Sequence, residues 1–349
     1  MKATRKLGKS SDSRTRGRAR TEAGSEEARQ LKERLKEADT GRCTEPVEVY
    51  VDHLLGKGYS GSTVERYVRD GLRFVQWAEG QNVEIQQVSY ADILHYVQGL
   101  RGKVKQRSIS ATVNSLRHWF DHMVGTGAAM ENPTRQVAIK GVQRRHLYDI
   151  LSRQQLDRLY HDHTWTENEK HKNQNWYRAS ALTHQRNRAI VGLLVFQGLN
   201  VTEIARLSEQ DLKLREGKVY IAGTRRSNER ELSLEAAQIL DLMEYHLKAR
   251  PALLALTRKT SDRFIVSTGS GQGINNAMFK LTEKLHQQDN SVKSMKQIRT
   301  SVITHWLKLY NLREVQHMAG HRYVSSTEAY RINDLADLQE DIGKFHPIG

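Results

Sequence analysis

The sequence predicts a mainly α-helical protein with one small antiparallel β-hairpin, divided into a helical domain and a larger mixed domain. Three observations support this fold class. Apolar residues recur at helical spacings of three and four from residue 47 onward. One pair of short β-type segments flanks a turn that begins with glycine. A proline at position 133 separates two helical regions, and 349 residues are enough to bury a core in each.

Residues 1–44 are predicted to form a basic flexible arm. Ser and Gly accompany its basic residues, and apolar residues are too few to bury a core. These basic residues include Lys2, Arg5, Lys6, Lys9, Arg14, Arg16, Arg18 and Arg20. Charges of opposite sign alternate between Glu26 and Ala38, so this stretch can become helical. A solvated tail without a specific role and an arm that contacts a polyanion both fit this composition.

Residues 45–133 are predicted to form a small helical domain. Ser62 and Glu65 have the spacing of a capping box at the start of an amphipathic helix, and a second helix fits residues 91–100. A third helix is predicted from apolar residues spaced four, three, four and three positions apart, and Gly125 and Gly127 follow its end. The residues on its buried face are Ile109, Val113, Leu116, Phe120 and Met123. Nearby basic residues form either a binding surface or a solvated face: Lys103, Lys105, Arg107, Arg117 and His118.

A linker over residues 134–146 is predicted to join this domain to a second domain over residues 147–349. Pro133 lacks an amide donor and restricts the residue before it, which stops the helical pattern. Ser152 and Gln155 have capping-box spacing and open the next helix. Residues 161–183 are polar and are predicted to be irregular. An apolar helix end over residues 192–199 follows, and the next helix begins at Glu203.

Residues 218–222 and 230–234 are predicted to be the two strands of a basic hairpin. Their β-type residues flank the segment Gly223-Thr-Arg225-Arg226-Ser-Asn-Glu, which supplies the turn. The helical pattern returns from residue 236 to residue 247.

The charge balance indicates a polyanionic partner. The chain has 55 Lys and Arg against 40 Asp and Glu, a formal net charge of +15, and clustered cations gain affinity by displacing counterions from phosphates. Nucleic acid is the first candidate. Anionic membrane is the competitor, but no apolar run approaches the length of a bilayer span, and the basic N-terminus lacks an apolar signal segment. We therefore expect a soluble cytoplasmic protein associated with the nucleoid.

No cofactor and no metal are predicted. Cys43 is the only cysteine, which excludes an intrachain disulfide framework and a thiolate zinc cluster. His161 and His163 have no further ligands at regular spacing, which favours a surface loop over a metal site. The glycines between residues 269 and 273 lack the lysine and serine of a P-loop, so nucleotide hydrolysis is not indicated.

The second domain contains the residue types that phosphodiester transfer requires. A protein nucleophile needs a positioned hydroxyl, cationic donors around the phosphate oxygens, and an acid for the leaving oxygen. Lys296 and Arg299 are three residues apart on a helix and can therefore point at one phosphate. Near the C-terminus His321 follows a glycine, and Ser325 can cap a short helix that carries Tyr330.

Together these motifs resemble the tyrosine recombinases, the phage-type integrases. The segment Gln197-Gly198-Leu199-Asn200-Val-Thr-Glu203 is similar to the first catalytic box, and Arg225 falls in the hairpin. Lys296 to Arg299 resembles the second box, and His321 with Tyr330 completes the set. The resemblance covers roughly residues 45–335. It implies a helical DNA core-binding domain followed by a catalytic domain.

The resemblance implies a role for each matched residue. Tyr330 would attack a DNA phosphate and form a 3′-phosphotyrosyl bond, whereas the neighbouring hydroxyl of Tyr323 does not match the motif. Arg299 would bind the scissile phosphate bidentately and stabilise the transition state. Lys296 would donate to the same phosphate, and His321 would hydrogen-bond the phosphate or the tyrosine oxygen.

The sequence departs from the family pattern at two positions. Asn200 stands where the family has a phosphate-clamping arginine, and Arg225 stands where it has a lysine that protonates the leaving oxygen. Arginine stays charged and is a poor general acid. Arg225, Arg226 or Arg206 could supply the missing cation from a neighbouring element. Glu203 matches an acidic position that would orient basic side chains, although helix capping or a surface ion pair fits it equally.

The function that the resemblance implies is site-specific recombination of double-stranded DNA without metal or ATP. In this family four protomers assemble on paired DNA sites, and accessory DNA-bending proteins would be further partners. An apolar stripe after Tyr330 could dock on a neighbouring protomer or pack on its own domain, with members Leu335, Leu338, Ile342 and Phe345. Two alternatives remain open: a catalytically impaired DNA-binding relative, and a type IB topoisomerase-like enzyme that nicks and reseals DNA.

Overall fold

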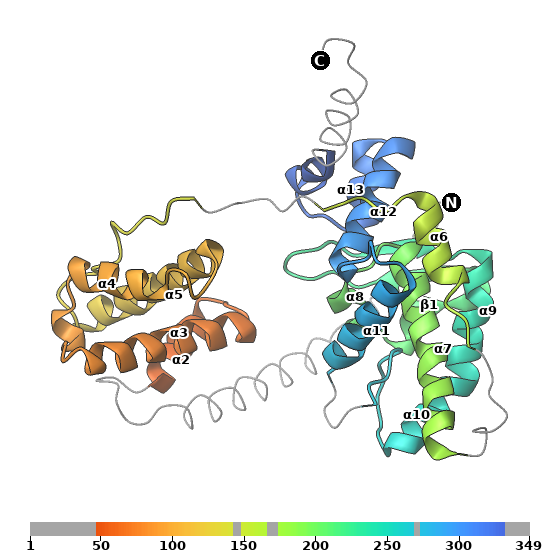
Figure 1. The fold of residues 1–349 in the computed structure, drawn as a ribbon, viewed down its shortest axis with the longest axis horizontal. Coiled ribbons are helices and arrows are strands. Elements are labelled where there is room, and N and C mark those ends of the chain that lie inside the picture. The colour runs from red at the N-terminus through yellow and green to blue at the C-terminus, as the bar shows by residue number, and fades with distance from the viewer. Residues whose placement is uncertain (1–46, 142–147, 166–173, 269–272, 332–349) are drawn as a thin grey trace, which may run out of the picture. The chain divides into compact units, whose positions relative to one another are not determined.

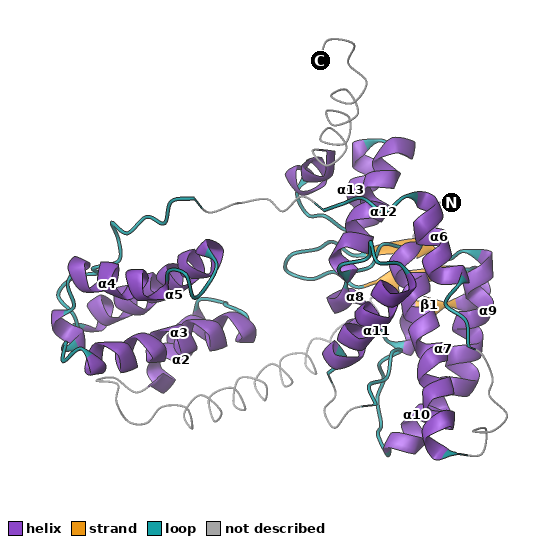
Figure 2. Cartoon of the chain, in the orientation of Figure 1, coloured by secondary structure: helices purple, strands orange, loops and turns teal. Residues whose placement is uncertain are grey.

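The computed structural model describes residues 47–141, 148–165, 174–268 and 273–331 of the chain (Figure 1). The chain divides into two compact units between residues 146 and 147. The predicted arm over residues 1–44, the end of the predicted linker and the apolar stripe from Leu335 to Phe345 lie outside the described residues. Figure 2 shows that helices make up most of both units, with strands only in the second.

The first unit is a bundle of helices. They are α2 (Val47–Gly56), α3 (Gly61–Gly80), η1 (Ile85–Gln87), α4 (Tyr90–Leu100) and α5 (Gln106–Thr126). Phe74 of α3 and Phe120 of α5 are fully buried between them, with ring centroids 5.7 Å apart in an edge-to-face arrangement. A Cβ at Gly71 would lie 2.1 Å from the Trp119 ring, so α3 and α5 pack closely because residue 71 has no side chain.

Two local predictions for this unit differ from the structure. Helix α3 begins at Gly61 with Ser60 as its N-cap residue, so the predicted capping box of Ser62 and Glu65 is wrong. Helix α5 continues through Gly125 and ends at Thr126, and Gly127 caps it with a φ of +78°, the left-handed conformation that glycine adopts without strain.

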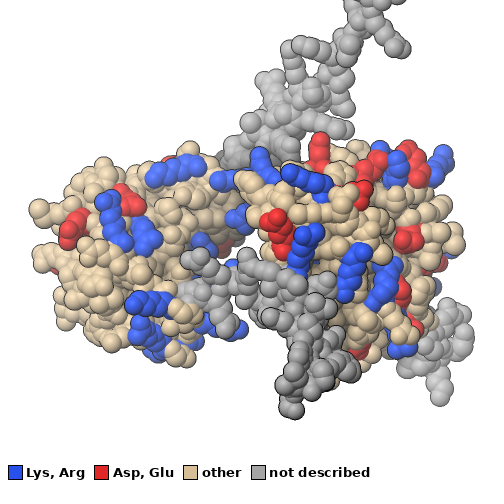
Figure 3. Space-filling view, turned by 90° about the horizontal axis from the view of Figure 1, so that it is seen from above, with Lys and Arg blue, Asp and Glu red and all other residues tan. Residues whose placement is uncertain are grey.

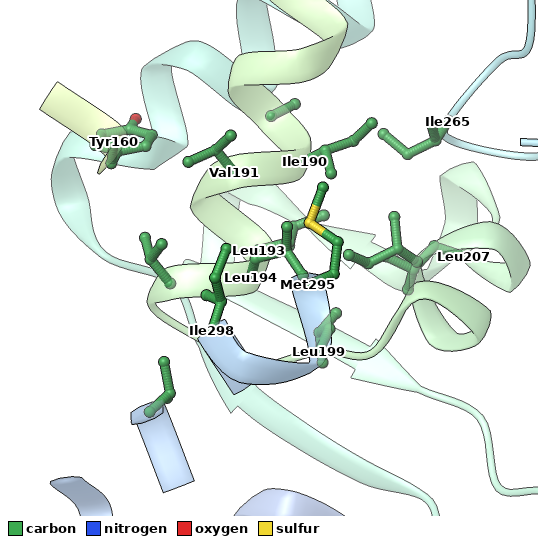
Figure 4. Close-up of a cluster of buried hydrophobic side chains, with 14 of the residues drawn as sticks. Tyr160, Ile190, Val191, Leu193, Leu194, Leu199, Leu207, Ile265, Met295 and Ile298 are labelled. Carbon is green, nitrogen blue, oxygen red and sulfur yellow. The ribbon is translucent and has the colours of Figure 1, made fainter. Parts of the chain in front are cut away.

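The second unit surrounds one long helix, α7 (Asn175–Val195). Before α7 comes α6 (Arg153–His161); after it follow α8 (Val201–Arg206), η3 (Glu209–Asp211), β1 (Leu212–Lys213), η4 (Leu214–Glu216), β2 (Lys218–Ile221), β3 (Arg230–Ser233), α9 (Ala236–Glu244), the π-helical η5 (Tyr245–Ala249), α10 (Arg250–Thr257), α11 (Asn275–Gln288), α12 (Met295–Leu309) and α13 (Leu312–Ala319). A last helix covers residues 324–331. Figure 4 shows the C-terminal half of α7 buried against α12, with Ile190, Leu194 and Ile298 among the core side chains.

The capping box at the start of α6 is confirmed. The Ser152 hydroxyl accepts from the amide of Gln155, and the Gln155 side chain accepts from the amide of Ser152. The prediction of an irregular segment is wrong for residues 175–183, which form the first half of α7. Ser325 lies inside the last helix, which begins at residue 324, so it is not the cap.

The sheet is antiparallel with the strand order β1-β2-β3, so the predicted hairpin is confirmed and a short third strand joins it. Val219 of β2 pairs with Leu232 of β3, and both are buried. Arg230 begins β3 two residues before Leu232 and therefore points to the same, buried face. Among the described residues, no helix is long and apolar enough to cross a membrane, and no group of His, Cys, Asp and Glu could hold a metal ion.

Candidate active site

Arg299 is fixed in the interior of the second unit by three backbone and side-chain acceptors. Its Nη1 donates to the carbonyl of Gly198 at 2.5 Å and to Oε2 of Glu203 at 3.2 Å. Its Nη2 donates to the carbonyl of Ala319 at 2.7 Å. These contacts join α12 to the turn before α8 and to the end of α13, so the guanidinium holds three separate segments together.

Glu203 binds a second buried arginine with its other carboxylate oxygen. Nη1 of Arg230 donates to Oε1 of Glu203 at 2.9 Å, and the side chains of Arg230 and Glu203 are 0% and 5% exposed. Burial opposes ionisation of the Glu203 carboxyl, but its hydrogen bond to Arg230 and the charges of Arg230 and Arg299 hold its pKa below the ordinary value. Glu203 is therefore an ionised carboxylate shared by two guanidinium groups.

Asn200 is the N-cap residue of α8. Its side-chain oxygen accepts from the amide of Glu203 at 2.9 Å, and Oε2 of Glu203 accepts from the amide of Asn200 at 2.9 Å. This reciprocal pair satisfies amides that the first helical turn leaves without partners. Position 200 thus serves the helix start and fixes the backbone of Glu203, and it adds no charge to the site.

The turn from Gly320 to Arg322 lies between the buried arginines and the hairpin. Gly320 ends α13 with a φ of +68°, and a Cβ there would lie 2.2 Å from Nη1 of Arg230. The amide of Asn228 donates to the carbonyl of Gly320 at 3.0 Å, and Nη1 of Arg322 donates to the carbonyl of Arg225 at 2.8 Å. The hairpin loop is therefore attached to the segment that leads to His321.

His321 and Tyr330 stack against each other. Their ring centroids are 5.5 Å apart with an angle of 18° between the ring planes. Nδ1 of His321 and the hydroxyl of Thr327 are 2.9 Å apart, so the helix that carries Tyr330 also orients the imidazole. Tyr330 packs partly buried against the core of the second unit, whereas Tyr323 is 68% exposed.

Burial and two nearby cations keep His321 neutral. Burial, followed by the positive charges of Arg299 and Arg230, lowers its pKa to about 4, and the charge of Glu203 only partly opposes this. At neutral pH the imidazole can therefore accept a proton through one nitrogen and donate through the other. The site combines a neutral imidazole, a phenol and two guanidiniums.

The structure brings some of the sequence-predicted site residues together and leaves others apart. Arg299, Glu203, His321 and Tyr330 form one cluster, as the contacts above describe. Lys296 lies on the exposed side of α12, with its Nζ 5.6 Å from the centroid of the Tyr148 ring, so it does not share the buried position of Arg299.

The three arginines expected to replace a cation at position 200 are all exposed. Arg225 and Arg226 lie in the hairpin loop, and Arg206 lies in the last turn of α8. The carbonyl of Arg206 accepts from Nη1 of Arg263 at 2.7 Å. Among the described residues, no hydrogen bond or ion pair joins the side chains of Arg206 or Arg226 to Glu203.

Arg230 is the residue of this cluster that the sequence reasoning missed. The signal was present in the strand pattern, because side chains alternate between the faces of a strand. Arg230 shares its face with Leu232 and Leu234, both of which are buried. An arginine on an apolar strand face requires a buried anionic partner, and Glu203 is that partner.

A second group of basic and aromatic side chains lies on the first unit. The rings of Tyr67 and His118 stack with centroids 4.9 Å apart, and the guanidinium of Arg66 lies 5.1 Å from the Tyr67 ring centroid. Burial lowers the pKa of His118, and the charges of Lys57, Arg117 and Arg66 contribute, although the charge of Asp121 opposes them. Figure 3 shows Lys and Arg exposed over both units. This arrangement suits a phosphate backbone.

The chain matches two family models and is similar to several known proteins. The phage integrase N-terminal SAM-like domain matches residues 47–126, and the phage integrase family matches residues 170–336. Tyrosine recombinase XerD of Shewanella oneidensis is 28% identical over 321 residues, covering 89% of this chain and 100% of the relative. Tyrosine recombinase XerC of Bacillus pumilus is 26% identical over 308 residues, covering 86% and 96%.

Solved structures of low sequence identity share the fold. The XerH site-specific recombinase bound to palindromic difH substrate, a post-cleavage complex, has a TM-score of 0.63 and 16% identity, with 90% of this chain and 93% of that chain covered. A lambda integrase dimer bound to a COC′ core site has a TM-score of 0.55 and 12% identity, with 82% and 75% covered.

Proposed function

Because the chain belongs to the phage integrase family and is a tyrosine recombinase, we propose that Tyr330 is the nucleophile with which it cuts and rejoins DNA. The observation that carries the proposal is the convergence of distant segments on one cluster. Residues 198–203, Arg299 and residues 319–330 meet there, with Arg299 held by Glu203 and His321 stacked on Tyr330.

In the proposed reaction the phenolic oxygen of Tyr330 forms a bond to the scissile phosphorus. The bond between phosphorus and the 5′-oxygen breaks, and the leaving oxygen takes up a proton to become a 5′-hydroxyl. Neutral His321 can accept the phenolic proton or donate to a phosphate oxygen. The phosphotyrosyl bond retains the energy of the broken phosphodiester, so resealing requires neither ATP nor a metal ion.

Arg299 binds a non-bridging phosphate oxygen in this proposal. Arginine has five N–H donors, and Arg299 directs Nη1 and one donor of Nη2 to protein acceptors. Its side chain is 10% exposed, so a remaining donor can reach a phosphate. Lys296 and Arg225, both exposed, would contact the DNA phosphates from the rim of the site, where Lys296 could also give the leaving oxygen its proton.

The basic and aromatic group around Tyr67 and His118 is proposed to hold the DNA backbone from the first unit. Double-stranded DNA is the partner that the DNA-bound structural neighbours suggest. Assembly of four protomers on paired sites, help from DNA-bending proteins and action at the nucleoid belong to the same proposal.

The experiment that tests this proposal traps the covalent intermediate. The full chain is incubated with sheared genomic DNA of its host, covalent protein–DNA complexes are precipitated with detergent and potassium, and the attached DNA is sequenced. We expect the wild type to enrich one site and Tyr330→Phe to enrich none. Tyr323→Phe is the matched control, because it removes an exposed hydroxyl just before the helix that carries Tyr330 and should trap DNA as the wild type does.

Three outcomes distinguish the alternatives. Trapping by Tyr330→Phe would show that another residue is the nucleophile. Specific binding without trapping would identify a binding-only relative, for which the neutral Asn200 is the favouring observation. Trapping without exchange between two duplexes would identify a nicking and resealing enzyme.

A further inference from the structure

We propose that Arg230 is a catalytic residue that binds the scissile phosphate and supplies the guanidinium that Asn200 does not provide. The inference rests on the proposed function, because it requires a scissile phosphate beside Tyr330. It differs from the sequence-based hypothesis, which placed the replacing cation at Arg225, Arg226 or Arg206.

Arg230 has unused hydrogen-bonding capacity in a buried position. Its side chain is 0% exposed, and Nη1 donates to Glu203. Nε and Nη2 have no hydrogen-bond partner among the described residues. A buried donor without an acceptor is costly, and a guanidinium with free Nε and Nη2 presents two parallel N–H groups on one edge. Such an edge fits two oxygens of one phosphate.

Comparison with Arg250, another buried arginine of this unit, shows how different Arg230 is. Arg250, with a side chain 5% exposed, binds the carboxylate of Glu209 at 2.8 Å and the carbonyls of Ser261 and Arg263 at 2.7 to 3.1 Å. Its guanidinium is therefore bound on both edges by protein acceptors. Arg230 is bound through Nη1 alone, so the structure leaves one of its edges for a ligand that accepts hydrogen bonds.

The position of Arg230 identifies this ligand as the scissile phosphate. The two oxygens of the Glu203 carboxylate bind Arg230 and Arg299, so one side chain holds both guanidiniums. Gly320 lies against Nη1 of Arg230, and the next residue is His321, whose ring stacks on Tyr330. An anion bound by Arg230 in this cluster therefore lies among the groups that the reaction uses.

Access to the free edge requires movement of neighbouring segments, because the Arg230 side chain is 0% exposed. Gly320 lies against Arg230, and the hairpin loop is bound to the same turn by Asn228 and by the bridge between Ser227 and His321. Only a few hydrogen bonds hold the loop to this turn, and Asn228 is exposed, so DNA can replace them with phosphate contacts when the loop engages the duplex. The phosphate would then take the place of the missing acceptor.

The test measures single-turnover formation of the covalent complex on a nicked suicide duplex carrying the site recovered by trapping. We expect Arg230→Ala to slow cleavage by about 10²- to 10³-fold, as for the loss of one transition-state donor. Arg250→Ala is the matched control, because it removes a buried and paired arginine of the same unit. It should leave the cleavage rate of the folded protein near that of the wild type.

A second substrate separates phosphate binding from positioning. In this duplex a methylphosphonate replaces the scissile phosphate, which removes the negative charge of one non-bridging oxygen. On this substrate, a variant that lacks a phosphate-binding cation should cleave at a rate much closer to the wild-type rate than it does on phosphate. A variant whose site is misaligned should be slowed by the same factor on both substrates. We therefore expect Arg230→Ala to recover on methylphosphonate.

Each outcome is decisive. Unchanged cleavage of phosphate by a folded Arg230→Ala variant would overturn the inference, and so would a large loss on both substrates. If the alanine variant does not fold, Arg230→Lys is used instead, because it retains a cation beside Glu203. The ratio of its cleavage rate on methylphosphonate to its rate on phosphate should exceed the same ratio for the wild type. An equal ratio overturns the inference. Failure of the wild type to trap DNA would instead refute the proposed function.

Discussion

Replacing Glu203 with glutamine should destabilise the second unit more than any comparable surface substitution. The carboxylate accepts hydrogen bonds from Arg230, Arg299 and the amide of Asn200 at 2.9, 3.2 and 2.9 Å. The glutamine side chain keeps one acceptor oxygen, but its NH2 group would face the N–H donors of Arg230 or Arg299. Removing one partner of a buried ion pair costs about 3–5 kcal/mol. We expect a loss of that size in the free energy of unfolding.

Hydrogen exchange of the full chain provides the assay, because peptides from α8 and β3 report the second unit separately from the first. Glu231→Gln is the matched control: Glu231 pairs with Lys213 and Lys218 on the surface, where water and salt screen the charges, so little stability should be lost. A Glu203→Gln variant whose α8 and β3 amides exchange as in the wild type would refute the reasoning that this carboxylate neutralises the buried arginines.

Three further predictions concern the same region. Gly320→Ala should destabilise the protein and slow cleavage, because the new Cβ meets Nη1 of Arg230 at 2.2 Å in a left-handed backbone; wild-type melting and cleavage would contradict this. Asn200→Ala should cost about 1 kcal/mol in thermal or denaturant unfolding through loss of the α8 cap, and no change would show that the cap is dispensable. Burial, with nearby cations, lowers the pKa of both His321 and His184 to about 4. The unfolded chain then binds more protons below the ordinary histidine pKa of 6.5, so stability should fall as pH decreases from 6.5 toward 4; a flat profile in acid titration of the melting temperature would contradict this.

The fold was largely predictable because its signals are local. The capping box of Ser152 and Gln155 and the hairpin strands follow from residues within a few positions of each other, and both are confirmed. The start of α7 was missed because its first turns are polar and its second half is buried on all sides, so no amphipathic stripe marks the helix. The box at Ser62 failed because α3 begins at Gly61 with Ser60 as its N-cap residue, so Ser62 already lies in the first turn.

Only part of the candidate cluster was predictable from the sequence, and neither Arg230 nor the electrostatics of the cluster was. Arg299, His321 and Tyr330 could be identified from family spacing. The pairing of Arg230 with Glu203 links residues 27 positions apart, and it depends on how β3 packs against α8. Sequence periodicity places Arg230 on a buried face without naming its partner.

The Glu203 carboxylate, which Arg230 and Arg299 share, sets the net charge of the site and therefore affects which DNA ends the site can accept. Two guanidiniums and one carboxylate, with His321 neutral, leave the buried group with one uncompensated positive charge. A phosphodiester carries one negative charge and neutralises it, whereas a terminal phosphate monoester carries nearly two at neutral pH. A strand ending in a 5′-hydroxyl adds no charge when it returns to attack the phosphotyrosyl bond. In the proposed site a strand ending in a 5′-phosphate would bring excess negative charge beside a buried group that is already neutralised, so the charge balance would favour rejoining of the strand that was cut.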